Sequence, residues 1–123
     1  MHRTKGWTPM RRATITPGAR TFTGNGQCTA NFVFSDRAGN LYLGQAAHCA
    51  ETAEGKSGCT TPTHPLGTPV AITRGTANIG MGHVIARGRL AYSSWRTMQR
   101  LGERSTVRCA FNDFALIRLP RDA

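Results

Sequence analysis

The sequence is poor in acidic residues, in long apolar runs and in repeated segments. Only 6 of its 123 residues are Asp or Glu, against 16 Lys or Arg, which gives a formal net charge of +10. No apolar run is long enough to cross a bilayer, so no membrane partner is expected. The sequence also has no internal repeat and no low-complexity tract, which excludes solenoid and other repeat architectures.

The positive charge does not come with a nucleic-acid-binding pattern. A charge of this size would attract phosphates without sequence preference. The basic residues are spread along the chain, however, and Arg11 and Arg12 form the one adjacent pair. No RNP-like, KH-like or zinc-finger pattern accompanies them, and the Gly-x-Gly patches at 24–26 and 80–82 lack the rest of a phosphate-binding loop. We therefore expect a solvated basic surface and no specific nucleic-acid partner.

The spacing of the four cysteines and four histidines does not predict a metal site. No Cys-x-x-Cys occurs, and the nearest cysteine–histidine pair, Cys59 and His64, lies in a segment rich in Gly, Thr and Pro. His64 and His83 are expected on the surface or in a strand, and His2 in a basic leader. We therefore expect neither a metal nor another cofactor. Paired cysteines indicate an oxidising compartment, and four of them allow three disulfide connectivities.

Glycine and proline, with 14 and 6 residues, are scattered among short alternating runs, which predicts a β-rich chain with many turns. The six expected strands are 27–34, 41–43, 70–72, 79–85, 90–92 and 114–119. The first of them places Cys28, Ala30, Phe32 and Phe34 on one face and Thr29, Asn31 and Val33 on the other. The fourth places Ile79, Met81, His83 and Ile85 on one face. A turn at 36–40 is expected to join the first two strands into a hairpin.

One helix is expected, over residues 94–101. Trp95, Met98 and Leu101 recur on one side of it, as in an amphipathic helix. Ser94 is expected to cap its N-terminus, and Gly102 to end it.

Two segments carry the most specific signal. Residues 44–49 read Gly-Gln-Ala-Ala-His-Cys, and residues 112–117 read Asn-Asp-Phe-Ala-Leu-Ile. They resemble two of the three signature segments of chymotrypsin-like serine proteases, and the resemblance, over about residues 21–119, is closest to secreted trypsin-like enzymes of bacterial type. It implies an all-β domain over 21–123, a six-stranded antiparallel Greek-key barrel that is the first of the two barrels of that family.

The resemblance implies a role for one residue of each segment. His48 would be the general base that takes the proton of a serine nucleophile, and Asp113 would orient the imidazole ring and stabilise its charged form. The residues themselves also favour this pairing. Asp113 stands at the start of a largely apolar run, where a carboxylate needs a hydrogen-bond donor, and His48 can supply one.

The resemblance further implies which cysteines pair. A disulfide between Cys28 and Cys49 would tie the histidine loop to the preceding strand, and Cys59 and Cys109 would form the second pair. The first bond would close a loop of about twenty residues, which stabilises a protein by roughly 3 kcal/mol in the chain-entropy model.

The third signature segment of the family, Gly-Asp-Ser-Gly-Gly, does not occur in this sequence. The glycine-flanked context of the nucleophile is missing at all five serines, which are Ser35, Ser57, Ser93, Ser94 and Ser105. We therefore expect the N-terminal half of a serine endopeptidase that acts on proteins or peptides, cut short by a truncated or misread frame and inactive without the C-terminal barrel. The alternative is a non-catalytic, protease-like binding module.

The resemblance implies a secreted protein, and the cysteines agree with that. Residues 1–20 are expected to form a basic, disordered leader. No apolar stretch follows its positive start, so it is not expected to be a secretory signal peptide. We also expect an exposed apolar face where the partner barrel would pack.

Overall fold

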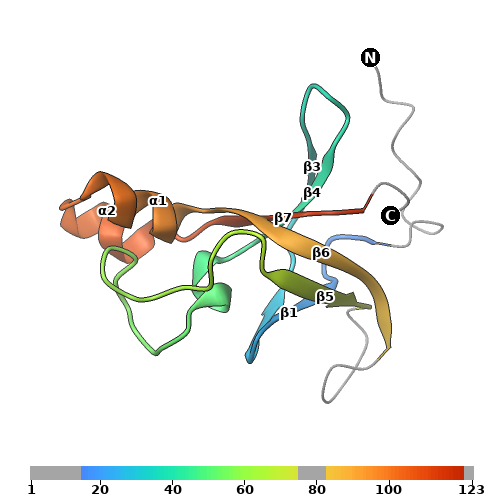
Figure 1. Cartoon of the computed structure of the whole chain (residues 1–123), viewed down its shortest axis with the longest axis horizontal. Helices are drawn as coiled ribbons and strands as arrows, with labels where there is room; N and C mark the ends of the chain where they lie inside the picture. The colour runs from blue at the N-terminus through green and yellow to red at the C-terminus, as the bar shows by residue number, and fades with distance from the viewer. Residues whose placement is uncertain (1–14, 75–82, 121–123) are drawn as a thin grey trace.

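A computed structural model describes residues 15–74 and 83–120, and antiparallel strands dominate that part of the chain. The strands are β1 (Arg20–Thr23), β2 (Gly26–Thr29), β3 (Val33–Ser35), β4 (Leu41–Gln45), β5 (Pro69–Thr73), β6 (Val84–Ser93) and β7 (Ala115–Arg118). The helices are the 3₁₀ turn η3 (Ala47–Ala50), α1 (Ser94–Leu101) and α2 (Thr106–Phe111). Figure 1 shows both α-helices at one end of the sheet, where β6 ends and β7 begins. The prediction of a mostly β, antiparallel chain is confirmed.

The strands form one sheet in the order β2-β1-β5-β6-β7-β4-β3. Its two edge strands, β2 and β3, follow one another in the chain and are separated by Ala30–Phe32 alone. That link bonds to both sides of the sheet, because the Ala30 N–H donates to the Ala19 carbonyl at 2.7 Å and the Asn31 N–H donates to the Gly44 carbonyl at 2.9 Å. The sheet therefore curls until its edges meet at one bend, which gives the fold a barrel-like form.

This bend corrects the single strand that the alternation over 27–34 predicts. Ala30 is buried and Val33 packs against the same core, although the two residues are three positions apart. The extra residue resets the inward–outward alternation, as a β-bulge does. Phe32 and Phe34 consequently point outward, with 65% and 38% of their surface exposed. The expectation that they share a face with Ala30 is wrong.

Two further differences bring the number of strands among residues 15–74 and 83–120 to seven. The runs expected as separate strands at 79–85 and 90–92 join in β6, although Ile79 and Met81 lie outside the described residues. Strand β1 was not expected, because Thr21 and Thr23 are the residues it buries completely. Thr21 donates a hydrogen bond to the side-chain carbonyl of Gln45, which is also buried. Because the inward face of β1 is polar, the strand has no alternation of hydrophobic residues that would predict it.

Helix α1 has the predicted bounds, and Gly102 ends it in the left-handed conformation, with φ of 71°. Its N-terminal cap is Ser93, whose side chain accepts a hydrogen bond from the Arg96 N–H, and not Ser94 as expected. Helix α2 was not predicted, and none of its residues is buried. Within the described ranges, no helix has the length and apolar character that a bilayer span requires.

Candidate active site

His48 lies on η3, directly after β4. Its neighbours Ala47 and Ala50 are completely buried, and they pack in one cluster with Trp95 and Met98 of α1. Small side chains at these positions let the 3₁₀ turn sit close against the helix. His48 itself is exposed, so the turn buries one side and presents the imidazole on the other. The expected position of His48, just past a strand, is confirmed.

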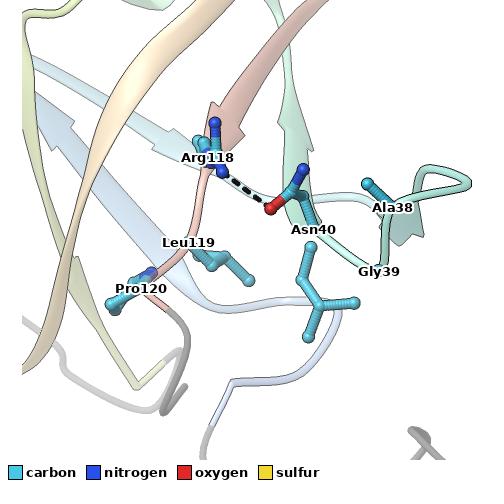
Figure 2. A pocket seen from close by; sticks show the side chains of 7 residues that line it. Ala38, Gly39, Asn40, Arg118, Leu119 and Pro120 are labelled. Atoms are coloured by element: carbon cyan, nitrogen blue, oxygen red, sulfur yellow. Dashed lines mark hydrogen bonds between the residues drawn. The ribbon is translucent and has the colours of Figure 1, made fainter.

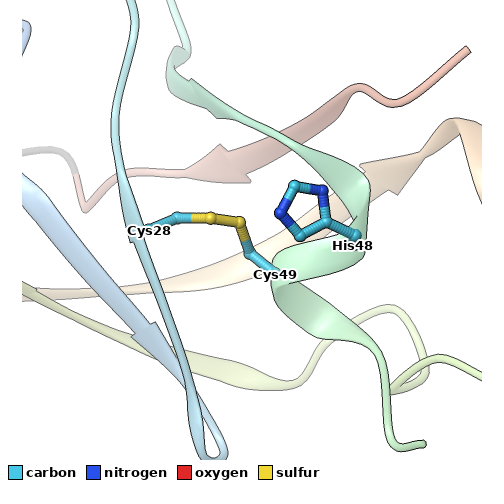
Figure 3. Close-up of side chains that lie close together, drawn as sticks. All are labelled: Cys28, His48 and Cys49. Atoms are coloured by element: carbon cyan, nitrogen blue, oxygen red, sulfur yellow. A yellow bond between two sulfur atoms is a disulfide. The ribbon is translucent and has the colours of Figure 1, made fainter. Parts of the chain in front are cut away.

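A disulfide holds η3 against the sheet. Cys28 of β2 pairs with Cys49, with 5.9 Å between their Cα atoms, a separation usual for a disulfide. Figure 3 shows the His48 ring beside this bond. Gly26 allows the close approach of β2, because a Cβ at that position would collide with the carbonyl of Cys49. The neighbour of His48 is thus fixed covalently.

The second disulfide joins Cys59 to Cys109, with 5.2 Å between their Cα atoms. It ties the loop between η3 and β5 to α2. Both pairings agree with those that the resemblance implies. The sulfur atoms of Cys28 and Cys49 and a ring nitrogen of His48 all lie within 4.8 Å of one another, but the two sulfurs are bonded and do not supply metal-binding thiolates.

Asp113 lies between α2 and β7, 65 positions after His48 in the sequence. It contacts His48 at two points. Its Oδ2 lies 2.6 Å from Nδ1 of the ring, and its Oδ1 accepts the backbone N–H of His48 at 2.8 Å. An ionised carboxylate only accepts hydrogen bonds, so Nδ1 carries the proton and Nε2 of the neutral ring is an acceptor. Nε2 has no hydrogen-bond partner among the described residues, and 53% of the His48 side chain is exposed.

Strand register explains why these two residues meet. Strands β4 and β7 are antiparallel neighbours, and Gln45, the last residue of β4, pairs with Ala115, the first residue of β7. His48 follows β4 by three residues and Asp113 precedes β7 by two. Both residues therefore emerge at the same end of the sheet. The sequence places them in suitable contexts, and the β4–β7 pairing brings them into contact.

A groove of about 640 Å³ opens beside the pair. Its lining includes His48, Asp113 and Trp95, together with Glu51 and Glu54. Three of the six acidic residues of the chain thus face one groove, although the net charge is +10. Glu51, Glu54 and Trp95 were not predicted to lie at the site, and Trp95 was expected on the apolar side of helix 94–101. The groove is open to solvent, so the imidazole can be reached from it.

The five serines, all within the described residues, do not line this groove. Ser93 and Ser94 are buried, and Ser105 caps α2 by accepting the Arg108 N–H. Ser57 accepts the Cys59 N–H, and Ser35 ends β3. None of them therefore lines the groove beside His48, where Nε2 could activate a hydroxyl.

A second hollow, of about 280 Å³, lies at the opposite end of β4 and β7. There Arg118 donates a hydrogen bond to the side-chain oxygen of Asn40 at 2.6 Å, as Figure 2 shows. Leu119 and Pro120 form one wall. Among the described residues, its lining has no acid, thiol, imidazole or hydroxyl side chain, so none of them offers a group for acid–base or nucleophilic chemistry.

Comparison with known proteins does not add a family to these findings: no family model, no curated protein and no solved structure matches the chain. What the site can do chemically therefore follows from its own geometry. It presents an imidazole whose Nδ1 is held by a carboxylate and whose Nε2 is an accessible acceptor.

Proposed function

We propose that this chain supplies the general base and the orienting acid of a serine-type endopeptidase. The observation that carries the proposal is the two-point contact between Asp113 and His48. Nε2 would remove the proton of a serine hydroxyl as it attacks the peptide carbonyl, and would later give that proton to the leaving amine. The carboxylate would keep the ring in the required tautomer and stabilise the imidazolium that forms.

The serine is proposed to come from a separate polypeptide segment with the properties of the C-terminal barrel of chymotrypsin-like proteases. That segment would also bring the N–H donors that stabilise the oxyanion. Exposed apolar side chains near Asp113 support such a partner. Phe111, two residues before it, is 79% exposed, and Phe34 is 38% exposed and packs edge-on against Phe114. Without the partner, the chain should not hydrolyse peptides, because both the nucleophile and the oxyanion donors are absent.

The topology is compatible with the first barrel of that family. If β2 and β3 are counted as two halves of one bent strand, the seven described strands become six and their order becomes circular. The two disulfides support a further part of the proposal, that the protein functions outside the cell in an oxidising environment.

The experiment compares the chain alone with the chain joined to whatever the DNA after the Ala123 codon encodes in any frame. A glycine-flanked serine segment is expected there. Oxidised protein of each kind is assayed with fluorogenic peptides and with a fluorophosphonate that labels activated serines. We expect neither turnover nor labelling for the chain alone, and both for the joined protein, with turnover abolished by His48→Ala.

Two results would contradict the proposal. Turnover by the chain alone that His48→Ala abolishes would show that no second segment is needed. A joined protein that folds, binds peptides and gives no labelling would favour the alternative, a non-catalytic binding module. Arg37→Ala, at an exposed turn remote from His48, is the matched control and should leave turnover unchanged.

A further inference from the structure

The hydroxyl of Ser94 is buried and is not used to cap a helix. Ser94 is 1% exposed, and the cap of α1 is its neighbour Ser93. The Ser94 Oγ donates a hydrogen bond to the carbonyl of Asn112 at 2.9 Å and accepts one from the N–H of Phe114 at 2.9 Å. The Ser94 backbone N–H donates to the Phe114 carbonyl at 2.8 Å. Three hydrogen bonds from one residue therefore bracket Asp113 without touching its side chain.

The backbone at Asp113 has little other support. Residues 112–114 lie between α2 and β7 and belong to neither. Asn112 is the C-terminal cap of α2, and its N–H still reaches Arg108. Among the described residues, the Ser94 hydroxyl is the one side-chain group that bonds the backbone both before and after Asp113.

We infer that Ser94 is a positioning residue, whose hydroxyl fixes the Asp113 backbone and thereby sets the two-point contact with His48. The required precision is high, because lengthening the 2.6 Å contact by 1 Å leaves no hydrogen bond. A hydroxyl suits this place because it donates and accepts at once. The catalytic consequence rests on the proposed function, whereas the effect on the His48–Asp113 contact does not.

The test measures the tautomer of His48 by NMR on the oxidised, ¹⁵N-labelled chain. In the neutral ring, Nδ1–H is expected to be the major tautomer, with a slowly exchanging downfield proton. Ser94→Ala should make Nε2–H the major tautomer and remove that resonance. Ser94→Thr, which keeps the hydroxyl, should restore both signals. Ser93→Ala removes a hydrogen bond at the same helix end and should leave the His48 signals as in the wild type.

In the joined protease, Ser94→Ala should lower kcat about 10²-fold with KM unchanged, the pattern of a displaced catalytic group. The NMR results separate this inference from the proposed function. If Asp113→Asn leaves the tautomer unchanged, both are wrong. If Asp113→Asn shifts it and a folded Ser94→Ala does not, Ser94 has no positioning role. If Ser93→Ala lost the Nδ1–H tautomer and the downfield resonance to the same extent as Ser94→Ala, the inference would also be overturned. Should Ser94→Ala fail to fold, Ser94→Cys replaces it under the same criteria.

Discussion

The Asp113 carboxylate holds the ring and the backbone of His48 at the same time, at 2.6 Å and 2.8 Å. One contact sets the rotation of the imidazole, and the other fixes the 3₁₀ turn on which it stands. A carboxylate is suited to this because its two oxygens accept independently. Position and tautomer of the imidazole are therefore controlled by one side chain.

Asp113→Asn keeps the shape of the side chain but replaces one acceptor oxygen by a donor. The one oxygen that remains cannot replace both acceptors, so the Nδ1–H and the backbone N–H of His48 can no longer both be satisfied. On the proposed function, kcat of the joined protein should fall by about 10⁴-fold, the size of this effect in the well-studied Ser-His-Asp proteases. Asp36→Asn, which changes an exposed acid on the β3–β4 turn, is the control and should have no effect on kcat. Equal kcat values for wild type and Asp113→Asn would contradict an orienting role.

Replacing both Cys28 and Cys49 by serine should lower the free energy of unfolding by about 3 kcal/mol, because it frees a loop of 21 residues in the unfolded chain. The loss is measured by urea denaturation. The matching change at Cys59 and Cys109, which frees 50 residues, should cost about 4 kcal/mol on the same basis. The two variants should differ in the NMR signals of His48, because the Cys28–Cys49 disulfide includes a residue of η3 and the Cys59–Cys109 disulfide does not. Identical His48 spectra would count against anchoring of η3 by the Cys28–Cys49 bond.

Gly26→Ala should destabilise the protein by about 1–3 kcal/mol, the range for overpacking. The added Cβ would meet the backbone carbonyl of Cys49, which cannot turn aside as a flexible side chain could. Thermal unfolding measures the change. Gln27→Ala, at the exposed next position, should stay within about 0.5 kcal/mol of the wild type. Equal melting temperatures for both variants would show that β2 can move away from η3.

The β3–β4 turn carries a pH dependence. Hydrogen bonds, chiefly from the Asn40 side chain, lower the pKa of Asp36 from 3.8 to about 2. A lowered pKa means that the folded state favours the carboxylate, so this stabilisation is complete above 3.8 and is lost as the pH falls toward about 2. Asp36→Asn should flatten the change in the urea midpoint over that interval. A midpoint that falls equally in wild type and variant would contradict this.

Tyr42 reports on the same turn from the alkaline side. Its hydroxyl donates to Asp36 at 2.9 Å, and this bond raises the pKa of the phenol above 10.0. Asp36→Asn should bring the pKa of Tyr42 back toward that value. The measurement is a phenolate absorbance titration in a Tyr92→Phe background, where Tyr42 is the one tyrosine left. No difference between the two titrations would show that the bond does not persist in solution.

The contrast between what could and could not be predicted has a physical basis. Helix 94–101 was predictable because apolar spacing and a terminal glycine agree, and the contact of His48 with Asp113 was expected from two short motifs. Strand β1 could not be predicted in this way, because its inward residues are threonines. The role inferred for Ser94 depends on backbone groups that no sequence pattern displays.

Helix α2 was missed for a different reason. Val107 and Phe111, which are 66% and 79% exposed, would normally mark a buried face. Here they mark a surface, and the helix is held by the Cys59–Cys109 bond. The expected pairing of Cys59 with Cys109 did not reveal the helix, because a disulfide does not specify the backbone conformation of the segment that it holds.

The curled sheet also governs how copies of this chain can meet. Its terminal strands are four and three residues long, so an incoming strand finds only a short ladder of backbone groups on either one. Growth into fibrils by strand addition is therefore disfavoured, even though aromatic side chains such as Phe32 face the solvent. Crowded solutions of this protein should form clusters that disperse with mild detergent and that do not bind amyloid dyes.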